Sequence, residues 1–298
     1  MTKLSVVINT LNEEKHIEEC IKSVKAIADE IIVVDMHSDD KTVKIAKSAG
    51  AKVFDHPRVG YVEPARNFAI SKASGEWILI LDADERLSKT LRKKIKIEIK
   101  KDEKSYFTLP RKNIIFDKWI EHTGWWPDYN IRLFKRGSVV WGDEIHSIPM
   151  TNGVGGDFEP KEENAIVHYN YVDVESFLNR LNKYTSIQGK ERFQEMKTFE
   201  GKSFIKSPVR EFVTRYFKYQ GYKDGLHGLA LSLLQAFSEF VVEIKVWQHY
   251  KFETSKVNIN ESMKTIREAQ SEINYWVSDT LIKETDSTFE RIRRKFKV

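Results

Sequence analysis

The sequence contains one cysteine, Cys20, among its 298 residues. A single cysteine cannot form a disulfide within the chain, so a disulfide-held secreted scaffold is excluded and a reducing compartment is expected. The sequence also lacks an uncharged run of about 18 residues, the length that a membrane-spanning helix requires. The nearest candidate, residues 226–247, contains Glu239, Glu243 and Lys245. The start of the chain has no signal-peptide pattern, which predicts a cytosolic protein.

Several functional motifs are also missing. No glycine-rich phosphate loop with an adjacent lysine occurs, which disfavours a nucleotidyltransferase, and no nucleic-acid-binding motif is present. The composition, 41% apolar and 31% charged, is that of a soluble globular protein. The formal net charge of +5 is unevenly distributed, because residues 201–298 carry 17 Lys and Arg against 12 Asp and Glu. This excess predicts an anionic partner, with a membrane surface or polyanionic acceptor favoured over nucleic acid.

Short apolar runs alternate with amphipathic helical patterns over the first hundred residues. Strands are predicted at 4–8, 30–34, 51–54 and 77–81. Helices are predicted at 14–28, 42–48, 64–73 and 88–100. This alternation predicts an α/β fold with a mostly parallel, doubly wound sheet covered by helices on both faces. Ligands of such sheets bind at the carboxyl ends of the strands.

The pattern changes after residue 100. Shorter strand-like runs at 105–109, 130–134 and 139–141 predict a mixed extension of the sheet. Helices are predicted at 174–193, 208–219, 223–250 and 259–283. In the second of these, Ser207 is expected to cap the helix and Pro208 to occupy its first turn.

Polar side chains gather where three of the predicted strands end, at residues 9–13, 35–40 and 82–85. One interpretation is that Asn12, Ser38 and Asp39 cap the following helices, since short oxygen-bearing side chains satisfy the first amides of a helix. Capping alone does not account for acidic clusters on neighbouring strand ends, because like charges repel unless a cation or a ligand compensates. Each side chain is therefore a candidate for either role.

Asp82 and Asp84 directly follow an apolar strand and are separated by one residue. Hard divalent cations take oxygen ligands and keep positions for water and substrate phosphates. The pair therefore predicts a metal site, or a contact with the donor, at this edge of a nucleotide-binding sheet.

Four blocks in this order resemble the inverting family-two glycosyltransferases, which have the GT-A fold. The blocks are Ser5 to Glu13, Ile32 to Asp35 with Ser38, Asp39 and Thr42, then Ala65-Arg66-Asn67, and Asp82-Ala83-Asp84. A looser similarity to the lipopolysaccharide-core β-1,4-glucosyltransferase branch continues through Arg132-Leu133-Phe134, His146 and His168-Tyr169. The resemblance implies a GT-A catalytic domain over 1–172, with a nucleotide-sugar half at about 1–100 and an acceptor half at about 101–172. Residues 173–298 form a helical C-terminal region.

The resemblance implies donor-binding roles for seven side chains: Thr10, Asn12, Glu13, Asp35, Asp39, Arg66 and Asp82. Thr10, Asn12 and Glu13 line the nucleoside pocket with Asp35, while Asp39 or Arg66 helps to hold the uracil or diphosphate end. The resemblance also implies that Asp82 faces the ribose or the donor sugar and that Asp84 binds Mn²⁺ or Mg²⁺. Chemistry alone also favours Arg66, because a guanidinium can bind phosphate oxygens in a bidentate fashion. The alternative for Arg66 is a surface salt bridge.

Inversion requires a base that removes the proton of the acceptor hydroxyl. Asp143 and Glu144 are the candidates, in a polar cluster after a short strand, with Asp128 as a third choice. Relatives in the glucosyltransferase branch show a glutamate directly after the histidine at this point, whereas Ser147 follows His146 here. The sequence therefore leaves the base open between these carboxylates and a solvated loop.

His146, His168, Trp125 and Trp126 complete the predicted site. His168 is a candidate for a third metal ligand, with Asp84 and Asp82, or for a phosphate contact, and His146 for acceptor binding. The alternative for each histidine is a structural role. Trp125 and Trp126 either belong to the core or stack on the apolar face of an acceptor sugar.

Residues 202–223 interleave aromatic and basic side chains. This pattern is typical of a helix at an anionic membrane surface, but a helix that packs on the catalytic domain or on a second subunit of a homodimer would look the same.

Together these features predict an enzyme that moves a hexose from a UDP-sugar to a hydroxyl of a glycan or glycolipid. The expected location is cytoplasmic, with peripheral attachment to the inner face of the cytoplasmic membrane. Transfer to a peptide or protein side chain is one alternative, and a non-catalytic sugar-nucleotide or membrane-binding protein is another.

Overall fold

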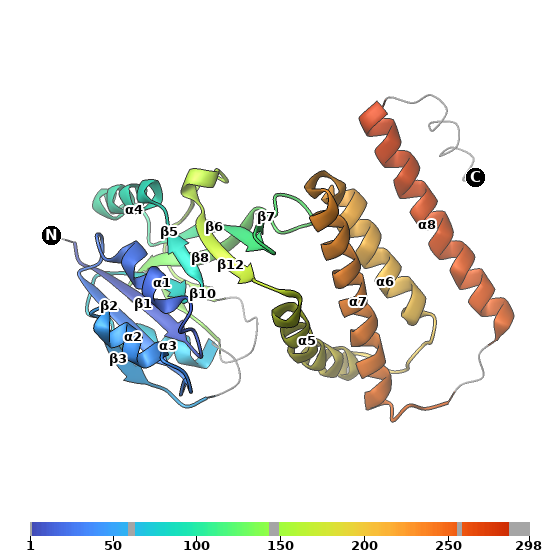
Figure 1. Ribbon diagram of the computed structural model, residues 1–298, viewed down its shortest axis with the longest axis horizontal. Helices are drawn as coiled ribbons and strands as arrows, with labels where there is room; N and C mark the ends of the chain where they lie inside the picture. The colour runs from blue at the N-terminus through green and yellow to red at the C-terminus, as the bar shows by residue number, and fades with distance from the viewer. Residues whose placement is uncertain (1, 59–62, 143–148, 255–257, 286–298) are drawn as a thin grey trace. The chain divides into compact units, whose positions relative to one another are not determined.

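Four parallel strands form the first half of the main sheet (Figure 1). They are β1 (Leu4–Thr10), β2 (Glu30–Asp35), β3 (Lys52–Asp55) and β4 (Trp77–Asp82), in the order β3-β2-β1-β4. All seven residues of β1 are buried, because it lies inside the sheet and is covered on both faces. The computed structural model describes residues 2–58, 63–142, 149–254 and 258–285. The predicted strands and their parallel arrangement are confirmed.

Helices cover both faces of this sheet. The side chains of α1 (Ile17–Val24), α2 (Thr42–Ser48) and α4 (Lys89–Lys101) join one hydrophobic cluster with alternate residues of the strands. The other alternate residues form a second cluster with α3 (Glu63–Ser71), which lies on the opposite face. The strand period of two thus divides the core into two layers, as expected for a doubly wound sheet.

The sheet continues from β4 through antiparallel and mixed pairings, in the order β4-β8-β6-β12-β5. These strands are β8 (Asp128–Lys135), β6 (Tyr106–Ile115), β12 (Ile166–Tyr171) and β5 (Glu85–Leu87). The predicted mixed extension is confirmed. The pairing of β12 with β5 is antiparallel and places His168 opposite Glu85, one residue from Asp84. The pairing thereby brings β12 next to the acidic residues that follow β4, Asp84 and Glu85.

Short elements complete this region. β11 (Gly155–Asp157) and β7 (Lys118–Trp119) pair with β6, while β9 (Val139–Val140) and β10 (Met150–Thr151) pair with each other. A single 3₁₀ turn, η1 (Glu162–Asn164), precedes β12.

The chain divides into two compact units. Unit 1 comprises Met1–Ile114 and Trp126–Asn170, and unit 2 comprises Ile115–Trp125 and Tyr171–Val298. The helical elements of unit 2 are α5 (Val174–Glu195), α6 (Ser203–Val213), the π-helical turn η2 (Thr214–Lys218), η3 (Gly221–Asp224), α7 (Leu226–His249) and α8 (Ile259–Thr285). Within this unit the buried Asp224 accepts hydrogen bonds from the backbone of His122 (3.0 Å) and from Thr123 Oγ1 (3.1 Å), which ties 115–125 to the helices.

The helix predicted to begin at Pro208 begins five residues earlier. Pro208 lies inside α6, and Ser207 does not cap it but donates a hydrogen bond to Glu243 Oε1 (2.9 Å). A proline inside a helix removes one backbone hydrogen bond. Tertiary packing offsets this loss, because Phe204 in the preceding turn packs against Phe240 and Trp247 of α7.

The contacts of 202–223 are largely internal to unit 2. Phe212 stacks on Tyr216, and Phe217 packs edge-on against both rings. Lys206 pairs with Glu268 of α8 (2.6 Å). These contacts lie within the helical unit itself and involve neither the catalytic domain nor a second subunit. Within the described ranges, none of the helices combines the length and apolarity needed to cross a bilayer.

Candidate active site

The loops after β1 and β2 are tied together by their polar side chains. Asn12 Oδ1 accepts a hydrogen bond from the backbone of Asp39 (2.8 Å), and the backbone of Asn12 donates to Ser38 Oγ (2.8 Å). Ser38 Oγ in turn donates to the buried carboxylate of Asp35 (2.5 Å), while the backbone of Glu13 donates to Thr42 Oγ1 (2.8 Å). Five of the predicted donor-binding residues, Thr10, Asn12, Glu13, Asp35 and Asp39, thus lie on two connected loops at the carboxyl edge of the sheet.

The capping interpretation of Asn12, Ser38 and Asp39 is wrong. His16 precedes α1 and Lys41 precedes α2, and neither supplies a side-chain cap. The side chains of Asn12 and Ser38 tie the two loops together, whereas Asp39 contributes its backbone N–H and pairs its exposed carboxylate with Arg58.

Asn9 and Thr10 keep unused hydrogen-bonding capacity at the end of β1. Both amide atoms of the Asn9 side chain and Thr10 Oγ1 are buried without a hydrogen-bond partner among the described residues. Buried polar groups in folded proteins almost always have a partner. The register of the sheet places Asn9 beside Asp82 and Thr10 beside Asp35, so these atoms lie between the carboxyl ends of β2 and β4. Sequence reasoning did not single out Asn9.

Asp82 sits in a cluster of arginines. Arg66 Nη2 lies 3.0 Å from Asp82 Oδ1, and Arg132 Nη2 lies 2.7 Å from Asp82 Oδ2 and 2.5 Å from Glu85 Oε1. Burial alone would raise the pKa of Asp82, but the charges of Arg132 and Arg66 outweigh it and hold that pKa well below its ordinary value. Both oxygens of Asp82 are therefore engaged by guanidinium groups. The ion pair of Arg66 with Asp82 is largely buried, with the Arg66 side chain only 12% exposed, so it is not a surface salt bridge.

Asp84 points towards His168. The backbone of Tyr169 donates to the Asp84 carbonyl (3.0 Å), and His168 Nε2 lies 3.4 Å from Asp84 Oδ2. The other ring nitrogen, Nδ1, lies 2.6 Å from Oδ1 of the buried Asn113, whose Nδ2 donates to Asp128 Oδ2 (3.1 Å). Because a carboxylate only accepts, the amide nitrogen of Asn113 faces Asp128 and its oxygen faces His168. Nδ1 of His168 therefore carries a proton.

This arrangement fits a divalent cation. With Nδ1 protonated, the lone pair of neutral His168 is on Nε2, the atom that faces Asp84. Metal-binding histidines characteristically donate their second ring nitrogen in this way, which fixes tautomer and orientation. Within the described part of the chain, no three His, Cys, Asp or Glu side chains gather as a complete ligand set. Asp84 and His168 would thus leave most coordination positions to water and to phosphate oxygens.

Asp128 is held in a way that disfavours the role of base. Arg111 Nη2 lies 2.6 Å from its Oδ2, the atom that also accepts from Asn113. Burial would raise the pKa of Asp128, but Arg111 and the bond from Asn113 outweigh it, so the pKa lies below its ordinary value. A carboxylate with a depressed pKa is a weaker proton acceptor.

Of the remaining residues predicted for the acceptor side, some lie outside the described residues and the two tryptophans lie in different units. Asp143, Glu144 and His146 lie outside the described residues. Trp125 belongs to unit 2, where it packs edge-on against Tyr171 (6.2 Å between ring centroids) and belongs to a hydrophobic cluster, while Trp126 belongs to unit 1. The contacts of Trp125 are those of the core alternative.

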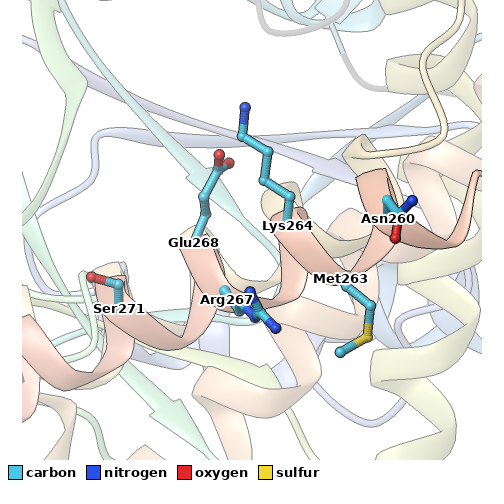
Figure 2. Close-up of a pocket in the computed structure, with 6 residues that line it drawn as sticks. All are labelled: Asn260, Met263, Lys264, Arg267, Glu268 and Ser271. Atoms are coloured by element: carbon cyan, nitrogen blue, oxygen red, sulfur yellow. The ribbon is translucent and has the colours of Figure 1, made fainter.

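A separate hollow lies on unit 2. It is lined by six residues of α8 alone, among them Met263, Lys264 and Arg267 (Figure 2). None of the predicted site residues lines it. A depression along one helix offers no convergent polar groups from other elements, so we do not assign it to the active site.

Comparisons with known proteins place the chain in a family. The sequence profile described as "Glycosyl transferase family 2" matches residues 5–154. An uncharacterized glycosyltransferase of Rickettsia typhi is 33% identical over 250 residues, which cover 81% of this chain and 85% of the relative. The lipopolysaccharide core biosynthesis glycosyltransferase LpsC of Rhizobium meliloti is 25% identical over 268 residues, or 87% of this chain and 97% of LpsC.

A solved structure is similar over a smaller part. Glucosyl-3-phosphoglycerate synthase from Mycobacterium tuberculosis, crystallised with Mn²⁺, UDP and glucosyl-3-phosphoglycerate, is 30% identical with a TM-score of 0.27. The match covers 28% of this chain and 34% of that one. From the family profile and the long relatives, we conclude that this chain is a glycosyltransferase that belongs to glycosyl transferase family 2, with a GT-A fold and a C-terminal helical region.

Proposed function

We propose that this enzyme moves a hexose from a UDP-sugar to a hydroxyl of a glycan or glycolipid, with inversion and with the help of a divalent cation. The observation that carries the proposal is the arrangement of Asp84, His168 and Asn113 beside the arginine-bound Asp82. The similarity to LpsC over most of both chains supports an acceptor of the cell-envelope or lipopolysaccharide type.

Asp84 and His168 would hold Mn²⁺ or Mg²⁺, whose positive charge stabilises the departing diphosphate. The protein's own contribution is to orient the two ligands. Asn113 fixes the ring of His168, and the antiparallel pairing of β12 with β5 sets the distance of His168 from Asp84.

The donor nucleoside would bind across the tied loops after β1 and β2. Thr10 and Asn9 offer the unused polar atoms there, and Asn12 and Asp39 shape the loops around them. Arg66 is 12% exposed at its side chain and contacts Asp82 by one nitrogen. Because Arg132 also neutralises Asp82, Arg66 can turn to a phosphate without leaving this carboxylate unpaired.

Single displacement requires a base on the acceptor side. We assign this role to Asp143 or Glu144, because Arg111 and Asn113 hold Asp128 and its lowered pKa makes it a weaker proton acceptor. The chosen carboxylate would take the proton of the acceptor hydroxyl as that oxygen attacks the anomeric carbon, and the carbon–oxygen bond to the diphosphate breaks at the same time.

Two alternatives differ in their acceptor or their chemistry. A peptide or protein side chain as acceptor would leave the donor site unchanged. A non-catalytic sugar-nucleotide-binding protein would bind the donor but release no UDP. We favour catalysis, at the cytoplasmic face of a membrane, because His168 Nε2 and Asp84 Oδ2 lie 3.4 Å apart on side chains that are only 6% and 13% exposed, an arrangement suited to holding a cation.

A screen of sugar nucleotides tests the proposal. Thermal melting is measured with each nucleotide sugar in the presence of Mn²⁺ and in EDTA, and UDP release is followed in parallel. A ligand at a hundredfold excess over its Kd stabilises the folded state by about 2.7 kcal/mol, so the correct donor raises Tm clearly. Stabilisation by UDP-sugars that needs the metal, with UDP release, is expected. If no sugar nucleotide shifts Tm, the proposal is wrong; a shift without UDP release supports the non-catalytic alternative.

A further inference from the structure

The exposed side of α4 is a row of lysines. Lys89, Lys93, Lys96 and Lys100 are all exposed, at a spacing that puts them on one side of the helix, while Leu91, Ile95 and Ile99 are buried against the sheet. Among the described residues, none of these four lysines forms an ion pair with a carboxylate.

A second group of lysines lies on α1 and α2. Lys25, Lys41 and Lys44 are exposed and line a hollow of about 520 Å³ between these helices, which also contacts the apolar side chains of Ile21 and Ile45. In the described part of the chain, none of the three ammonium groups forms a salt bridge, although the backbone N–H of Lys41 donates to Glu14 Oε2 (3.0 Å). Both groups are on the same face of the sheet, since α1, α2 and α4 share one hydrophobic cluster.

The two groups form one surface, here named the lysine face: Lys89, Lys93, Lys96 and Lys100 with Lys25, Lys41 and Lys44. Lys96 Nζ donates to the carbonyl of Ala26 at 3.3 Å, which joins α4 to the end of α1.

The seven lysines of the face outnumber the exposed carboxylates beside it, such as Glu14 and Glu163, and other nearby carboxylates pair with other cations. Glu18 and Glu19 on α1 both pair with Lys22, and Glu98 on α4 pairs with Lys101. Next to α4, in the segment that holds η1, Glu159 pairs with Lys161 and Glu162 pairs with Lys112. The equal numbers of acidic and basic residues before residue 201 therefore conceal a segregated positive surface.

The composition of the lysine face indicates what it binds. Its cations are ammonium groups, which act as point charges without the planar fork that selects a single phosphate. The helices α1, α2 and α4 contain no aromatic residue on which a nucleotide base could stack. Ile97 is 53% exposed among the lysines of α4, and an apolar side chain within a basic surface is typical of contact with the headgroup region of a bilayer.

We propose that the lysine face docks unit 1 on a bilayer that contains anionic lipids. The lysine face reaches the carboxyl edge of the sheet at Lys41. Lys41 follows Asp40, whose Oδ2 accepts a hydrogen bond from the backbone of Glu14 (3.1 Å) in the loop after β1. Docking would thus hold the donor-side loops near a membrane, where a lipid-linked acceptor resides. This inference goes beyond the transfer reaction, and its test needs neither donor nor acceptor.

Vesicle binding of the full-length chain tests this proposal. Lys89, Lys93 and Lys100 are replaced together by glutamine, which keeps helix propensity and removes three exposed charges. Each basic residue near an anionic surface strengthens binding about fivefold, so the triple variant should bind phosphatidylglycerol-containing vesicles about a hundredfold more weakly than the wild type. Pure phosphatidylcholine vesicles should bind neither protein. Raising the salt from about 0.1 M to about 1 M shortens the screening length from about 10 to about 3 Å and should release the wild type.

A matched control removes three charges from 202–223. Lys202, Arg210 and Lys218 are exposed and are replaced by glutamine in the same way. This control should bind anionic vesicles as the wild type does, and the melting curves of both triple variants should show intact folds. The proposal is overturned if the wild type ignores lipid charge, if the α4 variant binds normally, or if the control loses binding equally. Tighter binding to duplex DNA than to vesicles at the same salt would overturn it in favour of nucleic acid.

Discussion

Replacing Arg132 by methionine removes the cation at the centre of the buried cluster behind the site. Its side chain is 2% exposed and bonds to Asp82 and to Glu85, which is fully buried. Removing one partner of a buried ion pair costs about 3–5 kcal/mol, because the other charge stays buried without compensation. A domain of roughly 150–250 residues loses about 2–4 °C in Tm per kcal/mol, so Tm should fall by about 6–20 °C.

The loss should depend on pH in a defined direction. The folded-state pKa of Asp82 is depressed, so its ion pairs add stability above the unfolded carboxyl pKa of about 3.9, and this stability is lost as the pH falls further. The difference in Tm between the wild type and Arg132→Met should therefore be full at neutral pH and shrink below about pH 4. Scanning calorimetry at several pH values measures it.

Two control variants sharpen this experiment. Arg132→Lys keeps the charge but not the planar guanidinium, whose Nη2 contacts both Asp82 and Glu85, so it should lose less stability than Arg132→Met. The double variant with Glu85→Gln should lose less than the sum of the single losses, because it removes both members of one pair. A Tm unchanged by Arg132→Met, or a loss that is undiminished in acid, would refute the reasoning.

Three further predictions concern the site itself. Asp84→Ala should abolish metal-dependent donor binding yet leave the melting curve of the unliganded protein nearly unchanged; normal Mn²⁺-dependent binding would remove Asp84 from the metal site. Asn113→Leu should weaken Mn²⁺ affinity in the presence of UDP by about 10–100-fold, measured by electron paramagnetic resonance, because the tautomer of His168 is no longer fixed; unchanged affinity would assign Asn113 a purely structural role. Asp143→Asn and Glu144→Gln should be assayed separately, and the variant that lacks the base should lose kcat with donor affinity retained; wild-type kcat in both would redirect the search.

The sequence predicted the parallel half of the fold well, because local patterns determine it. The runs that became β1, β2, β3 and β4 are short, apolar and separated by amphipathic helices, and each strand end carries its polar residues in the same segment. Asp82 and Asp84 could therefore be placed at the edge of the sheet without knowledge of distant pairings.

Most residues that support the site lie in the antiparallel half of the sheet and could not be predicted from the sequence. Arg132 and Glu85 are separated by 47 positions, and Asn113 and His168 by 55, so only the order of β8, β6, β12 and β5 brings them together. A buried arginine or asparagine inside an apolar strand gives no sign of its partner in a single sequence. The same holds for Asp224, whose bonds to 115–125 join segments about a hundred residues apart.

Predictions of helix starts and caps from local sequence patterns also failed where tertiary contacts decide the structure. Ser207 before Pro208 has the pattern of a helix start, yet the helix begins at Ser203 because Phe204 packs on α7. Asn12 and Ser38 have the pattern of caps, yet they bind to the neighbouring loop.

Calorimetric titration of UDP into the purified chain, with Mn²⁺ present and then with EDTA, tests the central claim most directly. If Asp84 and His168 hold a cation that bridges to the diphosphate, UDP should bind at least tenfold more tightly with the metal, and Asp84→Ala should remove that difference. Equal affinity for UDP in both conditions, or no binding of UDP in either, would contradict the account.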